Sequence, residues 1–66
     1  MKINVNGKAR DCDLDNSLDD LLREMGAVPD RVAVVLNDDV VSPKRVPYVI
    51  LKEGDRIEIL TLAAGG

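Results

Sequence analysis

Apolar and polar residues alternate near both ends of the chain, in Lys2–Val5 and again in Arg56–Ile59. A period of two predicts strands that bury one face. Asn6-Gly7 follows the first run and favours a two-residue hairpin turn, because both residues tolerate a positive φ angle. We therefore expect a hairpin at the start of the domain, with a return strand that runs from Lys8 to about Leu14.

One helix is expected after this hairpin. Its apolar positions follow the helical spacing i, i+3, i+4 and i+7, and they are Leu18, Leu21, Leu22 and Met25. Asp15-Asn16-Ser17 supplies oxygen atoms that can cap the first turn, and Asp19 and Asp20 place negative charge where the helix dipole favours it. Gly26 lies where a left-handed residue commonly ends a helix. The helix should therefore bury one leucine-rich face.

The second half of the chain predicts further strands. Val32–Leu36 is apolar throughout, which is typical of a strand that is covered on both faces or that exposes one apolar face. Asn37–Asp39 has the composition of a turn and leads into a short fourth strand at Val40-Val41. The next segment, Pro43–Leu51, is expected to be irregular. Glu53–Asp55 then predicts a tight turn into the last strand.

Elements in this order predict an α+β domain in which a mixed sheet of four to five strands packs one face on the helix. The other sheet face is left uncovered. In the last strand, Ile57 and Ile59 have one parity, whereas Leu60 and Leu62 have the opposite parity. We expect a protein partner to dock on the uncovered face, with Leu60 and Leu62 as leading contacts, although scattered surface leucines are common.

Composition narrows the function. A chain of 66 residues makes one small domain, and its single aromatic residue, Tyr48, predicts an aliphatic core. The net charge of −3, without a basic cluster or stacking aromatics, excludes nucleic-acid binding. No apolar run approaches the roughly 20 residues of a membrane span, and Met1–Asn6 is too short for a signal peptide. We therefore expect a cytoplasmic protein with no membrane contact.

Side chains that could perform chemistry are scarce. Cys12 is the single cysteine, which fits a reducing compartment, and its inward parity with Leu14 favours a structural role over a sulfur relay. Histidine is absent, and Ser17 is better explained as a helix cap than as a nucleophile. The pairs Asp19-Asp20 and Asp38-Asp39 are typical of solvated charge rather than of a metal site. The sequence thus predicts no catalytic residue, no metal, no cofactor and no enzyme activity.

The strongest candidate for chemistry is the end of the chain, Ala63-Ala64-Gly65-Gly66. Glycine lacks a Cβ atom, so a di-glycine end can enter a narrow enzyme cleft that a side chain would block. We therefore expect a domain at residues 1–62 and a flexible tail at residues 63–66. The reactive group would be the Gly66 carboxylate, with Ala64 and Gly65 recognised by the partner. The alternative is an ordinary frayed terminus.

These features together resemble the ubiquitin-like sulfur carriers of the MoaD/ThiS superfamily, and the ThiS type more than the MoaD type. The resemblance covers the whole chain and rests on Ile3–Gly7, Leu18–Leu22, Val34–Val41, Glu53–Ile59 and Ala64–Gly66. It implies a β-grasp fold in which the first and last strands are parallel central neighbours. Two features depart from the family pattern. Pro43 and Pro47 replace a more helical polar segment, which bears on partner identity, and the tail lacks the proline of MoaD-like chains.

The resemblance implies that the chain is a co-substrate rather than an enzyme. A ThiF-like adenylyltransferase would use ATP to convert the Gly66 carboxylate to an acyl-adenylate. Sulfur from a donor such as a cysteine desulfurase would then produce a C-terminal thiocarboxylate. This group would donate its sulfur to thiamine thiazole on a ThiG-like thiazole synthase. The free carrier is expected to be a monomer.

Other functions stay open at this point. In a ubiquitin-like protein modifier, a lysine amine would attack activated Gly66 in place of sulfur. Within the carrier class, the acceptor could be molybdopterin or another sulfur metabolite. In a plain interaction module, the di-glycine end would be incidental, and removal of Gly66 would have no effect.

Overall fold

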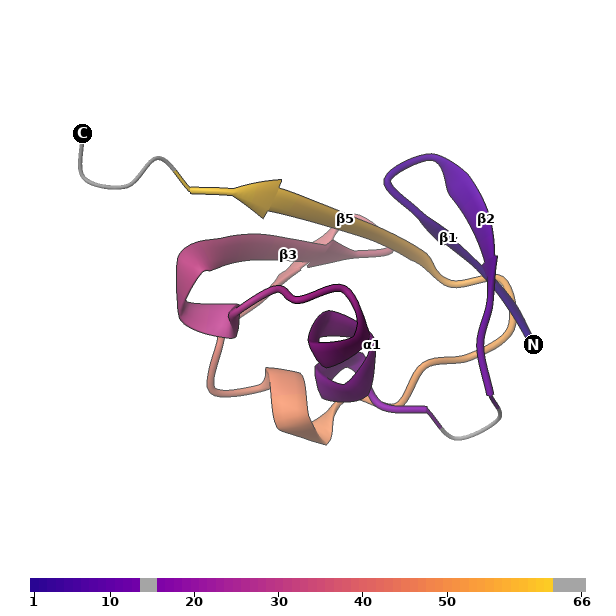
Figure 1. The fold of residues 1–66 in the computed structure, drawn as a ribbon, viewed down its shortest axis with the longest axis horizontal. Helices are drawn as coiled ribbons and strands as arrows, with labels where there is room; N and C mark the ends of the chain where they lie inside the picture. The colour runs from indigo at the N-terminus through magenta and orange to yellow at the C-terminus, as the bar shows by residue number, and fades with distance from the viewer. Residues whose placement is uncertain (14–15, 63–66) are drawn as a thin grey trace.

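A five-stranded mixed sheet packs one face against a helix in the computed structural model, which describes residues 1–13 and 16–62 (Figure 1). The strands lie in the order β2-β1-β5-β3-β4. Their bounds are Lys2–Val5 for β1, Lys8–Asp11 for β2, Val32–Leu36 for β3, Asp39–Val41 for β4 and Arg56–Thr61 for β5. The helix α1 spans Leu18–Glu24, and two short 3-10 turns span Pro29–Arg31 (η1) and Val46–Tyr48 (η2). The arrangement confirms the predicted α+β, β-grasp fold.

The opening hairpin forms where the sequence predicts it. Asn6 and Gly7 adopt φ angles of 52° and 85°, which the two-residue turn requires. The return strand β2 ends at Asp11, earlier than the expected end near Leu14. Asp11 pairs with Lys2 and the Cys12 N–H donates to Met1 C=O (2.8 Å), so β1 offers no further partner beyond this point. Leu14 lies outside the described residues.

Strand β5 occupies the centre of the sheet. It pairs in parallel with β1, through Asn4 opposite Arg56 and Val5 opposite Ile57. It pairs in antiparallel fashion with β3 along its whole length, from Leu36 opposite Ile57 to Val32 opposite Thr61. The first and last strands are therefore parallel neighbours, as the family resemblance implies.

The helix begins and ends as predicted, with one difference. Ser17 is the N-cap residue, and its Oγ accepts a hydrogen bond from the Asp20 N–H at 3.0 Å. Gly26 follows the helix with a φ angle of 72°. The predicted burial of Met25 is wrong: α1 ends at Glu24, Met25 is the C-cap residue, and its side chain is 37% exposed. The apolar stripe therefore ends with the leucines.

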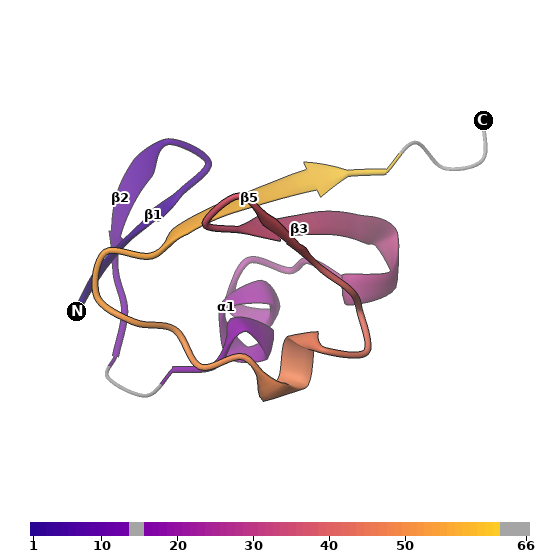
Figure 2. The same ribbon diagram turned by 180° about the vertical axis from the view of Figure 1, so that it is seen from behind.

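An aliphatic core fills the space between sheet and helix. The buried residues are Ile3, Val5, Leu18, Leu21, Leu22, Val34, Val41, Val46, Leu51 and Ile57. Tyr48 is 84% exposed, which confirms that the core needs no aromatic side chain. The segment Pro43–Leu51, expected to be irregular, contains the short η2 turn on the helix side of the sheet (Figure 2). This turn closes the core because it buries Val46.

Leu21→Ala should destabilise the domain strongly. Leu21 has no exposed surface, so its truncation removes apolar contacts and leaves a cavity that costs about 2–5 kcal/mol. Urea denaturation followed by circular dichroism measures the change. Val40→Ala is the matched control, because Val40 is 73% exposed and its truncation should change stability little. Equal denaturation midpoints for Leu21→Ala and the wild type would contradict this description of the core.

Candidate functional site

Strand β5 carries the chain towards the candidate tail. It runs to the end of the molecule that lies opposite the N-terminus (Figure 1). Its pairing with β3 continues past the strand, because the Leu62 N–H donates to Arg31 C=O at 3.1 Å. The chain is therefore anchored to the domain up to Leu62. Gly66, Gly65 and Ala64 lie outside the described residues, so their roles stay predictions, as does the domain boundary at residue 62.

Two asparagine side chains attach β5 to its neighbours. The Asn37 Oδ1 accepts from the Arg56 N–H at 2.9 Å, and the Asn6 Oδ1 accepts from the Ile59 N–H at 2.7 Å. Both asparagines have positive φ angles, 49° for Asn37 and 52° for Asn6, in the turns that flank β5. Sequence reasoning assigned these residues to turns but missed their side-chain bonds. No local signal predicted these bonds, because a turn asparagine commonly bonds a backbone group close to it in sequence, whereas Asn6 and Ile59 are 53 positions apart.

Asp55 completes the start of β5. Its Oδ1 accepts from the Asn37 Nδ2 at 2.9 Å, and its Oδ2 accepts from the Lys52 N–H at 2.7 Å. These bonds close the turn at Gly54, whose φ angle is 82°. Gly54 and Asp55 belong to the Glu53–Ile59 segment that resembles the family. They have a structural role, because they fix where the last strand starts.

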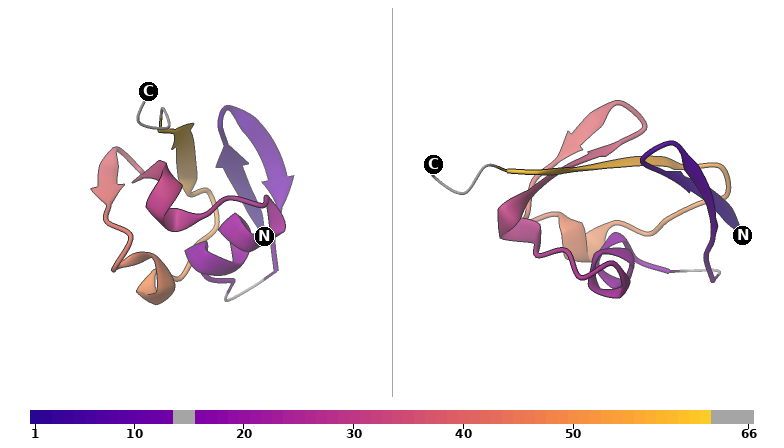
Figure 3. Two further views of the ribbon diagram at one scale, coloured as in Figure 1. Left: turned by 60° about the vertical axis from the view of Figure 1, so that its left-hand side comes forward. Right: turned by 45° about the horizontal axis from the view of Figure 1, so that its top comes forward.

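The sheet face opposite the helix carries an exposed apolar surface. Figure 3 shows α1 and the 3-10 turns on one side of the sheet, with the other side uncovered. Leu60 and Leu62 are 54% and 52% exposed, while Ile57 on the opposite parity is buried. Leu60 lies opposite Ala33, and Val35 lies opposite Val40. We call this surface the outer patch, and its residues are Ala33, Val35, Val40, Leu60 and Leu62.

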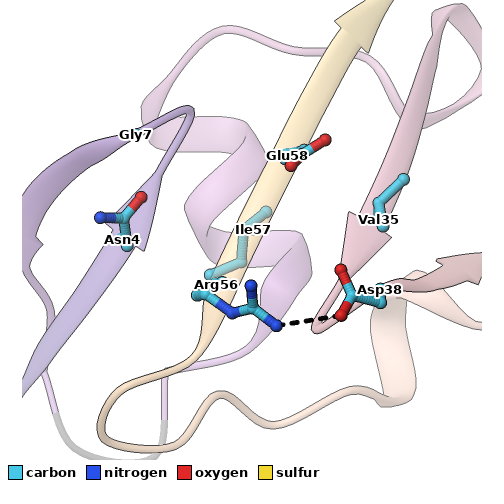
Figure 4. A pocket seen from close by; sticks show the side chains of 7 residues that line it. All are labelled: Asn4, Gly7, Val35, Asp38, Arg56, Ile57 and Glu58. Atoms are coloured by element: carbon cyan, nitrogen blue, oxygen red, sulfur yellow. Dashed lines mark hydrogen bonds and ion pairs between the residues drawn. The ribbon is translucent and has the colours of Figure 1, made fainter.

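The same face becomes polar away from the tail. A shallow hollow there is lined by side chains from three neighbouring strands, among them Asn4, Val35 and Glu58 (Figure 4). At one side of the hollow, the Arg56 Nη2 lies 3.1 Å from the Asp38 Oδ2. The outer face is thus charged near the start of β5 and apolar near its end. The apolar half of this face includes Leu62, the last described residue of the chain.

The remaining polar candidates have structural explanations. Cys12 is half-buried, packs against the core, and accepts a hydrogen bond from the Asn16 Nδ2 at 3.2 Å. Asp19 forms an ion pair with Arg23 at 3.1 Å. Within residues 1–13 and 16–62, no group of three side chains could hold a metal ion. The Ser17 Oγ serves as the helix cap.

The helix α1 has seven residues, and nowhere in the described part of the chain is there a helix long and apolar enough to cross a membrane.

The ion pair between the Lys2 Nζ and the Asp11 Oδ1 (2.8 Å) joins the open end of the hairpin. Its hydrogen bond lowers the pKa of Asp11 and raises the pKa of Lys2. Both side chains are exposed and lie on β1 and β2, whereas the outer patch lies on β3, β4 and the end of β5. This ion pair therefore contributes to the fold and is not part of the candidate site.

Known proteins are similar to this chain in sequence and in fold. The sequence model of the ThiS family matches residues 3–66. The sulfur carrier protein ThiS of Thermus thermophilus is 36% identical over 62 residues, which cover 94% of this chain and 95% of that protein. The crystal structure of a thiamine biosynthesis protein (ThiS) from Geobacter metallireducens has a TM-score of 0.83 and 30% sequence identity, with 100% of both chains covered.

A longer relative also matches. The thiazole synthase of Magnetococcus marinus is 38% identical over 66 residues, which are 100% of this chain and 20% of that protein. The chain therefore spans about a fifth of the length of that synthase. The family match covers nearly every residue, a ThiS carrier aligns over almost its full length, and the β-grasp fold is shared. The chain belongs to the ThiS family.

Proposed function

We propose that this chain carries sulfur for thiamine thiazole biosynthesis as a thiocarboxylate on Gly66. Its relationship to the Thermus thermophilus sulfur carrier and the Geobacter metallireducens thiamine biosynthesis protein supports this function. The single structural observation that carries the proposal is the position of β5. This central strand is anchored up to Leu62, and its last residues lie beside the exposed outer patch.

The proposed chemistry starts from a poor electrophile. A ThiF-like adenylyltransferase would transfer AMP from ATP to the Gly66 carboxylate, with loss of pyrophosphate. The outer sulfur of a persulfide formed by a cysteine desulfurase would then attack the acyl carbon and expel AMP. A thiol would reduce the acyl disulfide formed in this way, which releases the thiocarboxylate. The resulting thiocarboxylate sulfur is itself nucleophilic and can be passed to the growing thiazole. The chain returns with a carboxylate, so it acts as a co-substrate and not as a catalyst.

Docking of the domain must accompany insertion of the tail. Ordering four tail residues in a partner's cleft costs roughly 4–8 kcal/mol at about 1–2 kcal/mol per residue. Complete burial of an exposed leucine or valine side chain contributes about 1.5–3 kcal/mol. Leu60, Leu62 and Val40 each still expose half or more of their surface, so their burial can offset about 2–5 kcal/mol of that cost. The outer patch is therefore the proposed docking surface.

Two enzymes are the proposed partners of this surface. The adenylyltransferase must bind the carrier to activate it, and a ThiG-like thiazole synthase must bind it to receive sulfur. The match to a thiazole synthase of Magnetococcus marinus supports the second partner, because a domain like this one forms part of that longer protein. One exposed patch beside the tail suits both partners in turn, since each needs the same end of β5.

Removal of Gly66 should abolish activation. The reacting carboxylate would then belong to Gly65 and would lie one residue short of the phosphate of bound ATP. ATP–pyrophosphate exchange with the cognate adenylyltransferase measures this step, and we expect at least a hundredfold lower rate. A variant with one alanine added after Gly66 should fail equally, although it keeps both glycines. Full exchange activity in the variant that lacks Gly66 would remove the proposed reaction site.

Leu60→Glu should weaken docking while the fold stays intact. The new carboxylate would be buried without a partner at the interface, so the KM for the carrier in the exchange assay should rise about tenfold or more, with a smaller effect on kcat. Tyr48→Glu is the matched control. Tyr48 is also exposed and also gains a charge, but it lies on the η2 turn at the helix side of the sheet. Equal KM values for the two variants would contradict the assignment of the outer patch.

A further inference from the structure

One edge of β5 continues beyond the end of its neighbour β1. The parallel pairing of these strands covers only Asn4 opposite Arg56 and Val5 opposite Ile57. The Asn6 N–H still donates to Ile57 C=O at 2.9 Å, and the Asn6 Oδ1 accepts from the Ile59 N–H at 2.7 Å. The chain then turns into β2 at Gly7, whereas β5 runs on to Thr61 (Figure 1). The last part of β5 therefore has a strand on one side only.

The backbone groups at this open edge follow from the strand parity. The Leu62 N–H donates to Arg31 C=O on the β3 side, so the Leu60 N–H also points towards β3. The Thr61 N–H points the opposite way, together with Ile59 C=O and Thr61 C=O. Among residues 1–13 and 16–62, none of these three groups has a backbone hydrogen-bond partner on that side. They offer one donor and two acceptors to an added strand.

A groove lies directly beside this edge. One part of it is lined by the end of β5, the residues that follow α1, and the η1 turn, including Met25, Val28, Arg31, Ile59 and Thr61. The adjoining part lies between the opening hairpin and Met25, which follows α1, and is lined by Lys8, Ala9 and Arg10. Asn6 and Met25 line both parts, so the two parts adjoin at these residues. We call it the β5-edge groove.

The groove differs in charge from the rest of the chain. The protein has 12 acidic and 9 basic residues, yet the groove is lined by three cations, Lys8, Arg10 and Arg31, and by no carboxylate. Arg10 pairs with Glu24 at 3.4 Å. Lys8 and Arg31 form no ion pair within the described part of the chain. The groove also exposes apolar side chains, since Met25 and Val28 are 37% and 50% exposed.

We propose that the β5-edge groove binds an extended, acidic and apolar segment of the adenylyltransferase. The segment adds a strand to the open edge through the Thr61 N–H and the Ile59 C=O, a common way of binding extended segments. Its apolar side chains contact Met25 and Val28, and its carboxylates face Lys8 and Arg31. The partner's identity rests on the proposed function, whereas the chemistry of the segment rests on the groove alone.

The location gives this contact a specific use. Thr61 lies two residues before the expected tail, so a strand paired there fixes the direction of β5 just before Ala63. The outer patch holds β5 by one face, and the added strand holds it by one edge. Together they restrict the path of the tail more than the outer patch alone, which lowers the entropy still to be lost at the active site.

The edge pairing is tested by Thr61→Pro, with Thr61→Val as the matched control. Thr61 does not donate its N–H to β3, so proline removes only the open-edge donor, and Leu60 already has the extended conformation that precedes proline. Valine keeps the donor. Calorimetric titration with the adenylyltransferase, without ATP, should give a Kd about 3- to 10-fold higher for Thr61→Pro only. Equal Kd values for both variants, with both folded by circular dichroism, would overturn the proposal.

Hydrogen exchange of the wild-type protein gives an independent readout. The Thr61 amide should exchange fast in the free chain and at least tenfold more slowly in the complex, while the Leu60 amide is protected in both. Unchanged Thr61 exchange in the complex would overturn the edge pairing. If free Thr61 is already protected in a concentration-dependent dimer that Thr61→Pro abolishes, a second copy of the chain occupies the edge, and the proposal is wrong.

Charge reversal tests the acidic character of the segment. Lys8→Glu combined with Arg31→Glu should raise the Kd at least tenfold at low salt, with a smaller effect at high salt. Lys52→Glu with Lys44→Glu is the control with the same change in charge outside the groove. Equal effects of the two pairs would contradict an acidic occupant. The proposed function is tested independently of the groove: it is wrong if the variant that lacks Gly66 is still adenylated.

Discussion

The whole arrangement depends on the central position of β5. Its partners are β1 on one side and β3 on the other, and its inward residue Ile57 is 1% exposed within the aliphatic core. Asn6 and Asn37 add side-chain bonds to its backbone from the two flanking turns. A strand held in this way cannot shift its register by one residue without exposing its buried face. The described chain therefore ends at a defined place, with Leu62 bonded to Arg31.

A second constraint is the number of helices available to cover the sheet. One helix of seven residues covers one face, so the other face stays in contact with solvent. Polar residues occupy part of this face, but apolar residues remain at the end of β5. Under the proposed function, this uncovered surface becomes useful, because docking energy can offset the cost of ordering the tail in a partner's cleft. The sheet face that the single helix leaves uncovered is thus also the surface on which the proposed function depends.

Much of the fold could be predicted from the sequence, because its turns, its helix cap and its buried strand face depend on residues close together in the chain. Asn6-Gly7 specifies its own turn, Ser17 caps its own helix, and alternating residues show which side of β5 is buried. Met25 was placed wrongly because the helix ends one residue earlier than its apolar spacing suggested. The bond from Asn6 to Ile59 joins residues that are 53 positions apart in the sequence. This bond and the β5-edge groove depend on how the first and last strands pair, which no local sequence pattern encodes.

Intact-protein mass spectrometry tests the central claim most directly. The chain would be incubated with ATP, the cognate adenylyltransferase and a sulfur donor, beside the variant that lacks Gly66. A mass increase equal to replacement of one oxygen by sulfur, found in the full chain and absent in the variant, is the result that a Gly66 thiocarboxylate carrier predicts. An unchanged mass, or conjugates of higher mass formed with lysine-containing proteins, would contradict the sulfur-carrier account and favour a plain interaction module or a protein modifier.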